Sequence, residues 1–269
     1  MNDIIYGINP VLEALRSRER NFKEILIEAG RKGNEIHKIE LLAKSGNISI
    51  KRESGSTLEN ISGTNRHQGV VAIVSHKKEI ELHELIEQLY KKDNKPVIVI
   101  LDGIEDPGNL GAIIRSAEAL GIGGVIIPKD RAVGITPVVV KRSAGAIEHI
   151  PIVKVTNISN TIEELKKKGF WIVGVEAGAE KNCFSLSYND PIAVVFGSES
   201  NGMRRLTREK CDFIVSIPMK GKVSSLNVSA SCAIIFYEIM RQRGGGGVVT
   251  PSPLNSPPVK GGEIRNGDF

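Results

Sequence analysis

Two polar side chains, Asn109 and Arg115, lie in an apolar helix that follows an apolar strand. PVIVILD at 96–102 is typical of a buried strand, and NLGAIIRSAEALG at 109–121 has the pattern of a helix. Asn109, near the start of this helix, either caps it or contacts a ligand. Arg115 lies six residues further on, which is not one helical turn, so the two side chains need not share a face. Alone, Arg115 is either a solvated arginine or part of a site.

A second cluster combines a carboxylate with glycines. In VVFGSESNGM, the residues Gly197, Glu199 and Gly202 come at the end of the apolar strand 192–197. Glycine permits backbone conformations and a close ligand approach that a Cβ would block. Ligands usually bind at the carboxyl ends of parallel strands. The pattern predicts either a ligand-binding loop or a plain turn.

Ser224, Ser225 and Asn227 form a third cluster, at the start of the predicted helix 226–243 and after the predicted strand 213–218. The unpaired backbone N–H groups at a helix start bind carboxylates or phosphates. The alternative role for these side chains is to cap the helix.

Alternating helices and strands must position these clusters. Residues 1–76 predict a small α/β domain with helices on a sheet, and residues 77–95 a charged helical linker. Residues 96–243 favour a mostly parallel sheet with helices on both faces. The stretch 244–269 is rich in Gly, Pro and Ser and is predicted to be a disordered tail. Further strands are predicted at 24–29, 70–75, 124–128 and 171–176, and a further helix at 36–44.

The composition limits the class of protein. The 269 residues carry a formal net charge of +5, with a pI near 9.0, which favours an anionic partner. Aromatic residues make up 4%, which argues against stacking single-stranded bases on many exposed rings. No apolar run approaches the roughly 20 residues that span a bilayer, and no signal peptide is evident, so we expect a cytoplasmic protein. Cys183, Cys211 and Cys232 are widely spaced and are expected in the core, forming neither a metal site nor a disulfide framework.

The three clusters together, NLGAIIR, GSESNGM and IPMKGKVSSLNVS, resemble the three signature motifs of the SpoU branch of the SPOUT methyltransferases. SAGAIEHIPIVKVTN and RRLTREKCD extend the likeness, which covers about 96–243. In the N-terminal part, YGINPVLEAL and GTNRHQGVVA resemble the ribosomal-protein-like (L30e-like) substrate domain of members that act on rRNA. Within the family the likeness is closest to bacterial enzymes that methylate a guanosine ribose of 23S rRNA.

The resemblance implies a fold and a cofactor that periodicity does not reveal. The family's catalytic domain forms a trefoil knot whose loops hold S-adenosylmethionine, with no metal. The family works as a homodimer packed through the knotted region, with the RNA site near the subunit interface. Its partner is RNA, with no DNA and no membrane. Matching positions imply cofactor contacts at Val175, Glu176, Gly197, Ile217 and Leu226.

The resemblance also implies catalytic roles for Asn109, Arg115, Glu199 and Asn227, and substrate contacts for Arg115 and Ser225. The ribose 2′-oxygen attacks the methyl carbon of a sulfonium and must lose its proton. A guanidinium stays protonated at neutral pH, so we expect Arg115 to hold a phosphate beside the target ribose and to act indirectly. Asn109 and Asn227 would orient Arg115 and the hydroxyl, and Glu199 would order the middle loop and Arg115.

One residue departs from the family pattern: Ser200 stands where the middle motif usually has its second glycine. If this position needs a positive φ, serine costs about 1 kcal/mol or more. The departure bears on the geometry of the loop, not on the family.

Two other functions stay open. A tRNA ribose methyltransferase would have the same catalytic domain, although the N-terminal part favours rRNA. A non-catalytic RNA-binding or ribosome-assembly protein could keep the fold, but the intact polar motifs argue against it. A Rossmann-type enzyme is disfavoured, because GIGG at 121–124 precedes a strand instead of following one.

Overall fold

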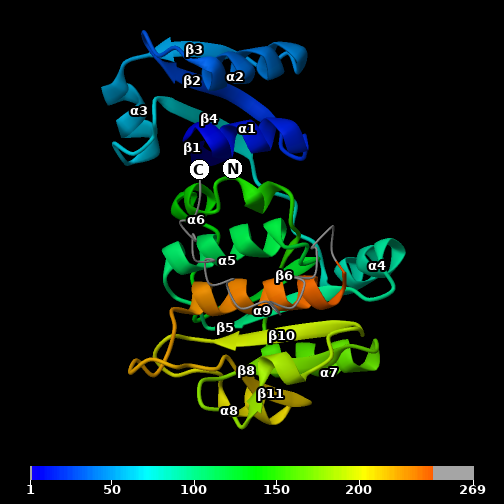
Figure 1. Ribbon diagram of the computed structural model, residues 1–269. Coiled ribbons are helices and arrows are strands. Elements are labelled where there is room, and N and C mark those ends of the chain that lie inside the picture. The colour runs from blue at the N-terminus through cyan, green and yellow to red at the C-terminus, as the bar shows by residue number, and fades with distance from the viewer. Residues whose placement is uncertain (1, 245–269) are drawn as a thin grey trace, which may run out of the picture.

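The chain folds around two separate β-sheets (Figure 1). The computed structural model describes residues 2–244. The predicted disordered tail, 244–269, therefore lies outside the described residues except for Gly244. Within the described part, no helix combines the length and the apolar character needed to cross a bilayer.

The N-terminal sheet has four strands in the order β1-β4-β2-β3. Its unit comprises β1 (Asn2–Tyr6), α1 (Ile8–Ser17), β2 (Phe22–Glu28), α2 (Asn34–Ser45), β3 (Ile50–Glu53), α3 (Gly55–Ser62) and β4 (Val70–Ser75). Ile25 and Ile27 of β2 belong to the core that α1 and α2 cover, whereas Leu26 packs with Leu58 of α3 in a separate cluster. Successive side chains of a strand point to opposite faces, so both faces of this sheet carry helices. The predicted small α/β domain is confirmed.

The larger sheet has seven strands in the order β7-β6-β5-β10-β8-β11-β9, and every pair is parallel. The strands are β5 (Val97–Asp102), β6 (Gly124–Pro128), β7 (Ile152–Val155), β8 (Trp171–Val175), β9 (Lys181–Asn182), β10 (Ile192–Gly197) and β11 (Phe213–Ser216). The helices are α4 (Leu82–Lys92), α5 (Pro107–Ala119), α6 (Pro137–Arg142), α7 (Ile158–Lys167), α8 (Arg205–Glu209) and α9 (Val228–Gln242), with short 3-10 turns η1 (Ala146–Glu148) and η2 (Cys183–Ser185).

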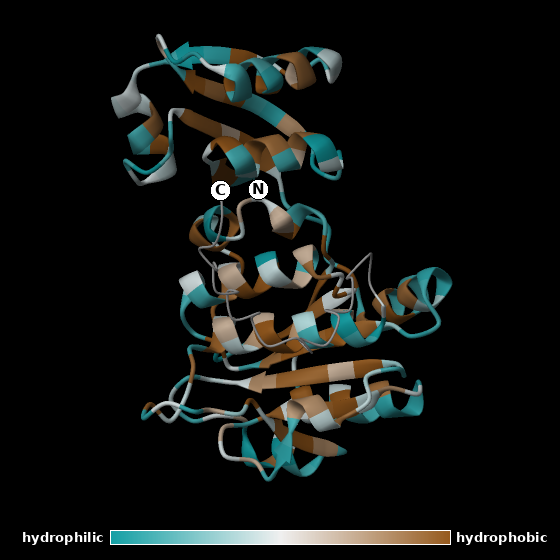
Figure 2. Ribbon diagram, viewed as in Figure 1, coloured by the Kyte–Doolittle hydropathy of each residue, from teal (hydrophilic) through white to brown (hydrophobic). Residues whose placement is uncertain are grey.

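Strand β5 contributes to a core on each face of the larger sheet. Val97 and Val99 are buried with residues of α5 and α9, whereas Ile98 and Ile100 are buried with residues of α4 and α7. Each fully buried aliphatic side chain contributes about 1.5–3 kcal/mol. In Figure 2 the central strands are accordingly brown, and α4 and α7 carry teal residues on their outer sides. The predicted parallel sheet with helices on both faces is confirmed, while the trefoil knot stays a prediction.

The N-terminal unit meets the larger one through buried charges. Arg20, between α1 and β2, donates from Nε to Glu148 of η1 at 2.8 Å, and the two side chains are 1% and 0% exposed. Lys77, in the segment before α4, donates to the carbonyl oxygens of Ile147 and Ile150. Separation of the two units would leave Glu148 without its cationic partner and Arg20 with Asp3 alone, which is unfavourable for buried charges. These contacts fix how the units sit on each other.

Candidate functional site

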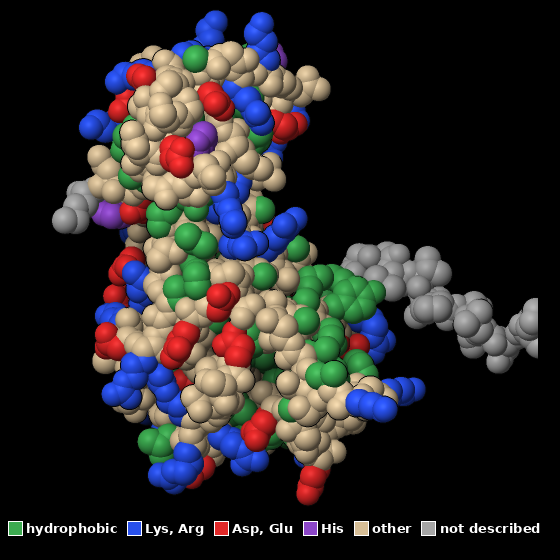
Figure 3. Space-filling model, turned by 90° about the vertical axis from the view of Figure 1, so that its left-hand side faces the viewer, with side chains coloured by type: hydrophobic (Ala, Val, Ile, Leu, Met, Phe, Trp, Pro, Cys, Tyr) green, Lys and Arg blue, Asp and Glu red, His purple; other side chains and the backbone are tan. Residues whose placement is uncertain are grey.

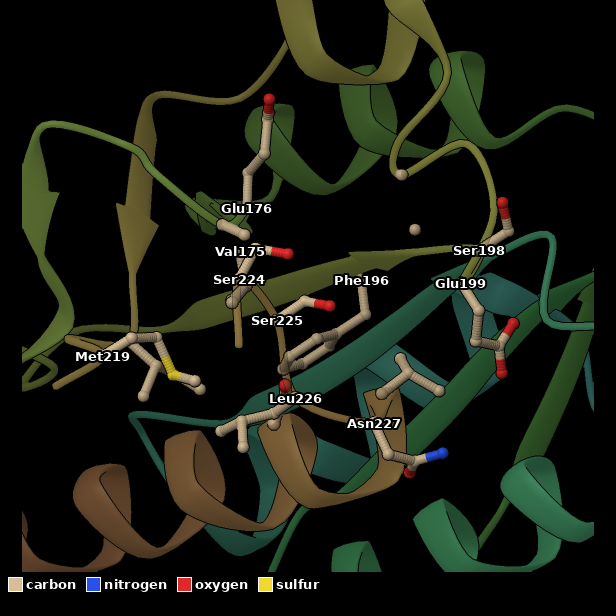
Figure 4. Close-up of a pocket in the computed structure, with 16 residues that line it drawn as sticks. Val175, Glu176, Phe196, Ser198, Glu199, Met219, Ser224, Ser225, Leu226 and Asn227 are labelled. Carbon is tan, nitrogen blue, oxygen red and sulfur yellow. The ribbon is translucent and has the colours of Figure 1, made fainter. Parts of the chain in front are cut away.

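The carboxyl ends of three neighbouring strands, β10, β8 and β11, border a hollow of about 460 Å³ (Figure 4). The segment that leads into α9 closes its other side. The five residues that the sequence predicts for cofactor contact all line this hollow: Val175, Glu176, Gly197, Ile217 and Leu226. Parallel strands end at the same edge of a sheet, which is why segments so far apart in the sequence meet here.

The walls of the hollow combine apolar side chains with polar ones. Phe196 is 2% exposed and meets Phe236 of α9 edge to face, with the ring centroids 6.0 Å apart. Leu226 and Met219 line the hollow and are each 39% exposed, so their side chains are open to a ligand. Met219 and Glu199 lie at opposite ends of the hollow in Figure 4. Apolar walls with a few polar groups are typical of a site for a small organic molecule.

Gly197 is the residue on which the middle loop turns. A Cβ at this position would lie 2.0 Å from the carbonyl carbon of Gly202 and 2.1 Å from the amide nitrogen of Met203. The loop folds back here because Ser198 and Gly202 exchange two backbone hydrogen bonds, each 3.0 Å long. Only glycine allows so close an approach of backbone to backbone.

Ser200, in contrast, is not strained. The positive φ of this loop falls on Gly202, at 63°, while Ser200 is not among the residues with positive φ. The hydroxyl of Ser200 accepts a hydrogen bond from the side-chain Nδ2 of Asn201 at 3.0 Å. The family's second glycine is therefore not required for the backbone conformation that this loop adopts.

Three of the predicted catalytic residues form one hydrogen-bonded chain at the end of the hollow. Asn109 of α5 donates from Nδ2 to Glu199 Oε1, and Asn227 donates from Nδ2 to Asn109 Oδ1 at 3.0 Å. Glu199 and Asn227 line the hollow itself. Residues separated by 90 and 118 positions in the sequence thus become neighbours.

Helix capping explains only part of these motifs. The cap of α5 is Asp106, whose carboxylate accepts from the backbone N–H of Asn109 at 2.7 Å, so the alternative of Asn109 as the cap is wrong. Asn227 does cap α9, because its Oδ1 accepts from the N–H of Ser229 at 2.9 Å. Its Nδ2 is still free to hold Asn109, so Asn227 combines both roles. Ser225 lines the hollow and is exposed.

Arg115 does not join this group within one chain. Its side chain is exposed and lines a different hollow, of about 660 Å³, between the N-terminal unit and α6. It has no hydrogen bond to Asn109, Glu199 or Asn227 within residues 2–244. The expectation that Glu199 and the two asparagines order Arg115 is thus not met inside a single chain.

Sequence reasoning missed one carboxylate, Asp102, which ends β5 and is 1% exposed. Its Oδ2 accepts from the backbone N–H of Arg204 at 3.0 Å, and its Oδ1 lies 3.2 Å from the Arg204 guanidinium. Asp102 thereby holds the far end of the loop that carries Glu199. Asp102 could have been found from the sequence, because it is a charged residue at the end of a strand that is otherwise fully apolar. A charge buried at such a position needs a partner.

The three thiols are not nucleophiles. Cys183 and Cys232 are fully buried, and burial raises the pKa of both. Burial also raises the pKa of Cys211 to about 12. A thiol, not a thiolate, is the stable form in all three cases, which makes attack on a substrate unfavourable. In the part of the chain that the structure describes, no group of three or more His, Cys, Asp or Glu side chains could hold a metal ion.

Known proteins with a similar sequence or structure are RNA methyltransferases. Residues 96–237 match the SpoU rRNA Methylase family, and residues 4–80 match a family described as RNA 2′-O ribose methyltransferase substrate binding. Bacillus subtilis YacO, named for the TrmH family of tRNA/rRNA methyltransferases, is 44% identical over 90% of this chain and 96% of its own length. The 23S rRNA (guanosine-2′-O-)-methyltransferase RlmB of Xylella fastidiosa is 40% identical over 90% of this chain and 97% of its own. The crystal structure of the SpoU methyltransferase AviRb from Streptomyces viridochromogenes with AdoMet has a TM-score of 0.76 and 26% identity, covering 91% of each chain.

Proposed function

The chain belongs to the SpoU rRNA methylase family, and we propose that it methylates the ribose 2′-oxygen of a guanosine in 23S rRNA, with S-adenosylmethionine as the methyl donor. The observation that carries the proposal is that the second and third motifs line one hollow, where Asn109 of the first motif binds Glu199, in a chain 40% identical to an RlmB enzyme. Because the proposed substrate is rRNA, we expect the protein to act in the cytoplasm. We further assign residues 1–76 to RNA binding, 77–95 to a linker and 96–243 to methyl transfer.

The hollow fits S-adenosylmethionine. When bound, this molecule supplies an electrophilic methyl group on a positively charged sulfonium. The apolar walls formed by Phe196 and Leu226 suit its adenine ring, and the carboxylate of Glu199 suits its positive charge. Gly197, which has no side chain, lets the loop that carries Glu199 fold back beside the end of β10 and so form this wall of the hollow.

The hydrogen-bonded chain Glu199–Asn109–Asn227 positions the hydroxyl that loses its proton. Asn109 binds one oxygen of Glu199, and the other oxygen, Oε2, has no hydrogen-bond partner within residues 2–244. A ribose hydroxyl can therefore donate to Oε2 while its oxygen faces the methyl group. Arg115, which stays charged, holds a neighbouring phosphate and favours the ionised oxygen by its charge. Ser225, at the rim, is assigned to substrate contact.

The exposed apolar residues of α9 form a candidate interface for a homodimer. On the outer face of α9, Ala230, Ala233, Ile234 and Tyr237 recur at helical spacing and are exposed or half-buried. Leu226, in the segment before α9, continues this apolar stripe. A solvent-exposed apolar stripe of this kind favours a protein interface. We propose that two copies pack through α9, so that the RNA site lies near the interface.

The test is methyl transfer to defined RNA. The enzyme is incubated with labelled S-adenosylmethionine and an unmodified transcript of 23S rRNA, and the product is hydrolysed with alkali. A 2′-O-methyl group blocks cleavage at its nucleotide, so ribose methylation leaves a labelled dinucleotide whereas base methylation leaves a labelled mononucleotide. Transfer to a tRNA transcript pool alone would favour the tRNA alternative. Absence of S-adenosylmethionine binding by calorimetry would favour a non-catalytic RNA-binding protein.

A further inference from the structure

A second hollow, which we call the junction pocket, lies between the N-terminal unit and the larger one. Its volume is about 660 Å³. It is lined by the end of α3 and the loop after it, by the end of β1, by α5 and by α6. Figure 3 shows Lys and Arg side chains gathered where the two units meet. The cationic lining residues are Arg66, Arg115, Lys141 and Arg142.

The charge of the junction pocket is not balanced by acids. None of its lining residues is an aspartate or a glutamate. Within residues 2–244 none of its four cations forms an ion pair. The hollow beside α4, in contrast, has five glutamates in its lining. Four cations held together without a counter-charge repel one another, and an anion from outside relieves this repulsion.

Two observations show that the cations of the junction pocket come from both units and face the same space. Lys141 donates from Nζ to Gln68 of the N-terminal unit, and burial lowers the pKa of its ammonium group. Tyr6, which also lines the pocket, is 6% exposed; burial raises the pKa of its hydroxyl, and the charges of Arg66 and Arg142, from different units, act to lower it. The cations therefore converge on one space from both sides of the junction.

Helix α5 connects the junction pocket to the methyl-transfer site. Asn109, in its first turn, belongs to the hydrogen-bonded chain at the cofactor hollow, and Arg115 lines the junction pocket. Six residues of α-helix rise about 9 Å. One RNA strand can thus contact both ends of this segment.

We propose that the junction pocket binds backbone phosphates of the RNA substrate beside the target nucleotide, with Arg66 and Arg142 as phosphate ligands from the two units. This inference rests on the proposed function and names the surface that grips the substrate. Phosphate contacts fix the register of a nucleic acid without reading its sequence. Arginine suits the task because its planar fork binds two oxygens of a phosphate together.

The test compares two double variants with equal loss of charge. Arg66→Gln with Arg142→Gln removes two cations from the junction pocket. Lys167→Gln with Lys168→Gln removes two exposed lysines at the end of α7, outside both hollows. Binding of a 23S rRNA transcript is measured by filter retention between 50 and about 200 mM salt. S-adenosylmethionine affinity and the unfolding midpoint are measured in parallel to establish that both variants fold.

We expect the arginine double variant to bind the transcript about tenfold to a hundredfold more weakly, with KM for RNA rising in step. The slope of log K against log salt should become shallower by about 1.4, which corresponds to two lost contacts with single-stranded phosphates. The lysine double variant should bind like the parent. Equal behaviour of the two double variants would overturn the proposal. The proposed function fails separately: if the parent transfers no methyl group to the transcript, methylation is contradicted, while the binding comparison still tests the pocket.

Discussion

Gly197, which has no side chain, shapes the hollow that we assign to the cofactor. The backbone of 202–203 packs within about 2.2 Å of where a Cβ of Gly197 would stand, so Gly197→Ala must displace the loop that carries Glu199. We expect a cost of about 1–3 kcal/mol in stability and loss of S-adenosylmethionine binding in calorimetry. Gly134→Ala is the matched control, because a Cβ there meets nothing within 4 Å. Parental affinity in Gly197→Ala would show that the loop does not form the cofactor site.

Arg115 is the residue whose role depends most on its chemistry and least on its packing. It is exposed and unpaired within residues 2–244, so Arg115→Lys and Arg115→Ala should both fold, dimerise and bind S-adenosylmethionine normally. Lysine keeps the charge but loses the planar fork, so we expect both variants to lose at least about two orders of magnitude in methyl transfer. Single-turnover rates at saturating RNA separate chemistry from binding. A near-parental rate for Arg115→Lys would show that Arg115 has no role in the reaction and is only a solvated surface residue.

The polar motifs could be predicted from the sequence, but the hydrogen bonds between them could not. Gly197, Glu199 and Asn227 were identifiable because they stand at strand and helix ends, where backbone groups are free. The bond between Asn109 and Glu199 was not predictable, because it depends on the packing of α5 beside the end of β10. Asp102 was missed because a carboxylate within an apolar strand gives no sign of its partner, which lies 102 positions away.

At the scale of elements, burial decided which strands could be predicted. β4, β6 and β10 match the predicted 70–75, 124–128 and 192–197, because nearly all of their residues are apolar and buried. β3 and β9 were missed: both are edge strands, and they carry mainly polar residues that face water. β1 was assigned to no element, although it is paired and half-buried, because only its last three residues are apolar.

The junction between the two units contains a buried ion pair, Arg20–Glu148. Glu148→Ala removes one of the two carboxylates that pair with the buried Arg20 and leaves Asp3 as the other, so we expect a loss of about 1.5–3 kcal/mol in the free energy of unfolding. Glu209→Ala is the control, because it breaks an exposed i,i+4 pair with Arg205 and should leave the stability within experimental error. Chemical denaturation of both variants provides the measurement. Equal stability of the two would mean that the Arg20–Glu148 pair does not stabilise the junction.

At the scale of the whole molecule, the exposed face of α9 is where we expect a second copy. Ile234 is half-buried and does not pack into the core of its own chain, so Ile234→Asp should separate the dimer without unfolding the monomer. Leu41→Asp places the same charge on an equally apolar but distant residue, 54% exposed on α2, and should leave the dimer intact. Sedimentation equilibrium distinguishes the two. A monomeric parent, or a dimer that Ile234→Asp does not affect, would contradict packing through α9.

The fold of residues 2–244 followed from the alternation of strands and helices, whereas the knot and the dimer that we expect rest on the family resemblance. Both depend on how distant segments thread and associate, and neither leaves a periodic pattern in the sequence. The functional conclusion therefore depends on the motifs and on the family rather than on the fold alone.

The most direct test of the central claim is to map ribose methylation by mass spectrometry in RNA from a strain that lacks this protein. Both 23S rRNA and tRNA are digested and compared with RNA from the parent strain and from the deletion strain complemented with the Arg115→Ala variant or the intact chain. The account predicts that one guanosine of 23S rRNA loses its 2′-O-methyl group, and that the intact chain restores it whereas Arg115→Ala does not. An unchanged set of 23S rRNA ribose methylations in the deletion strain would contradict the account.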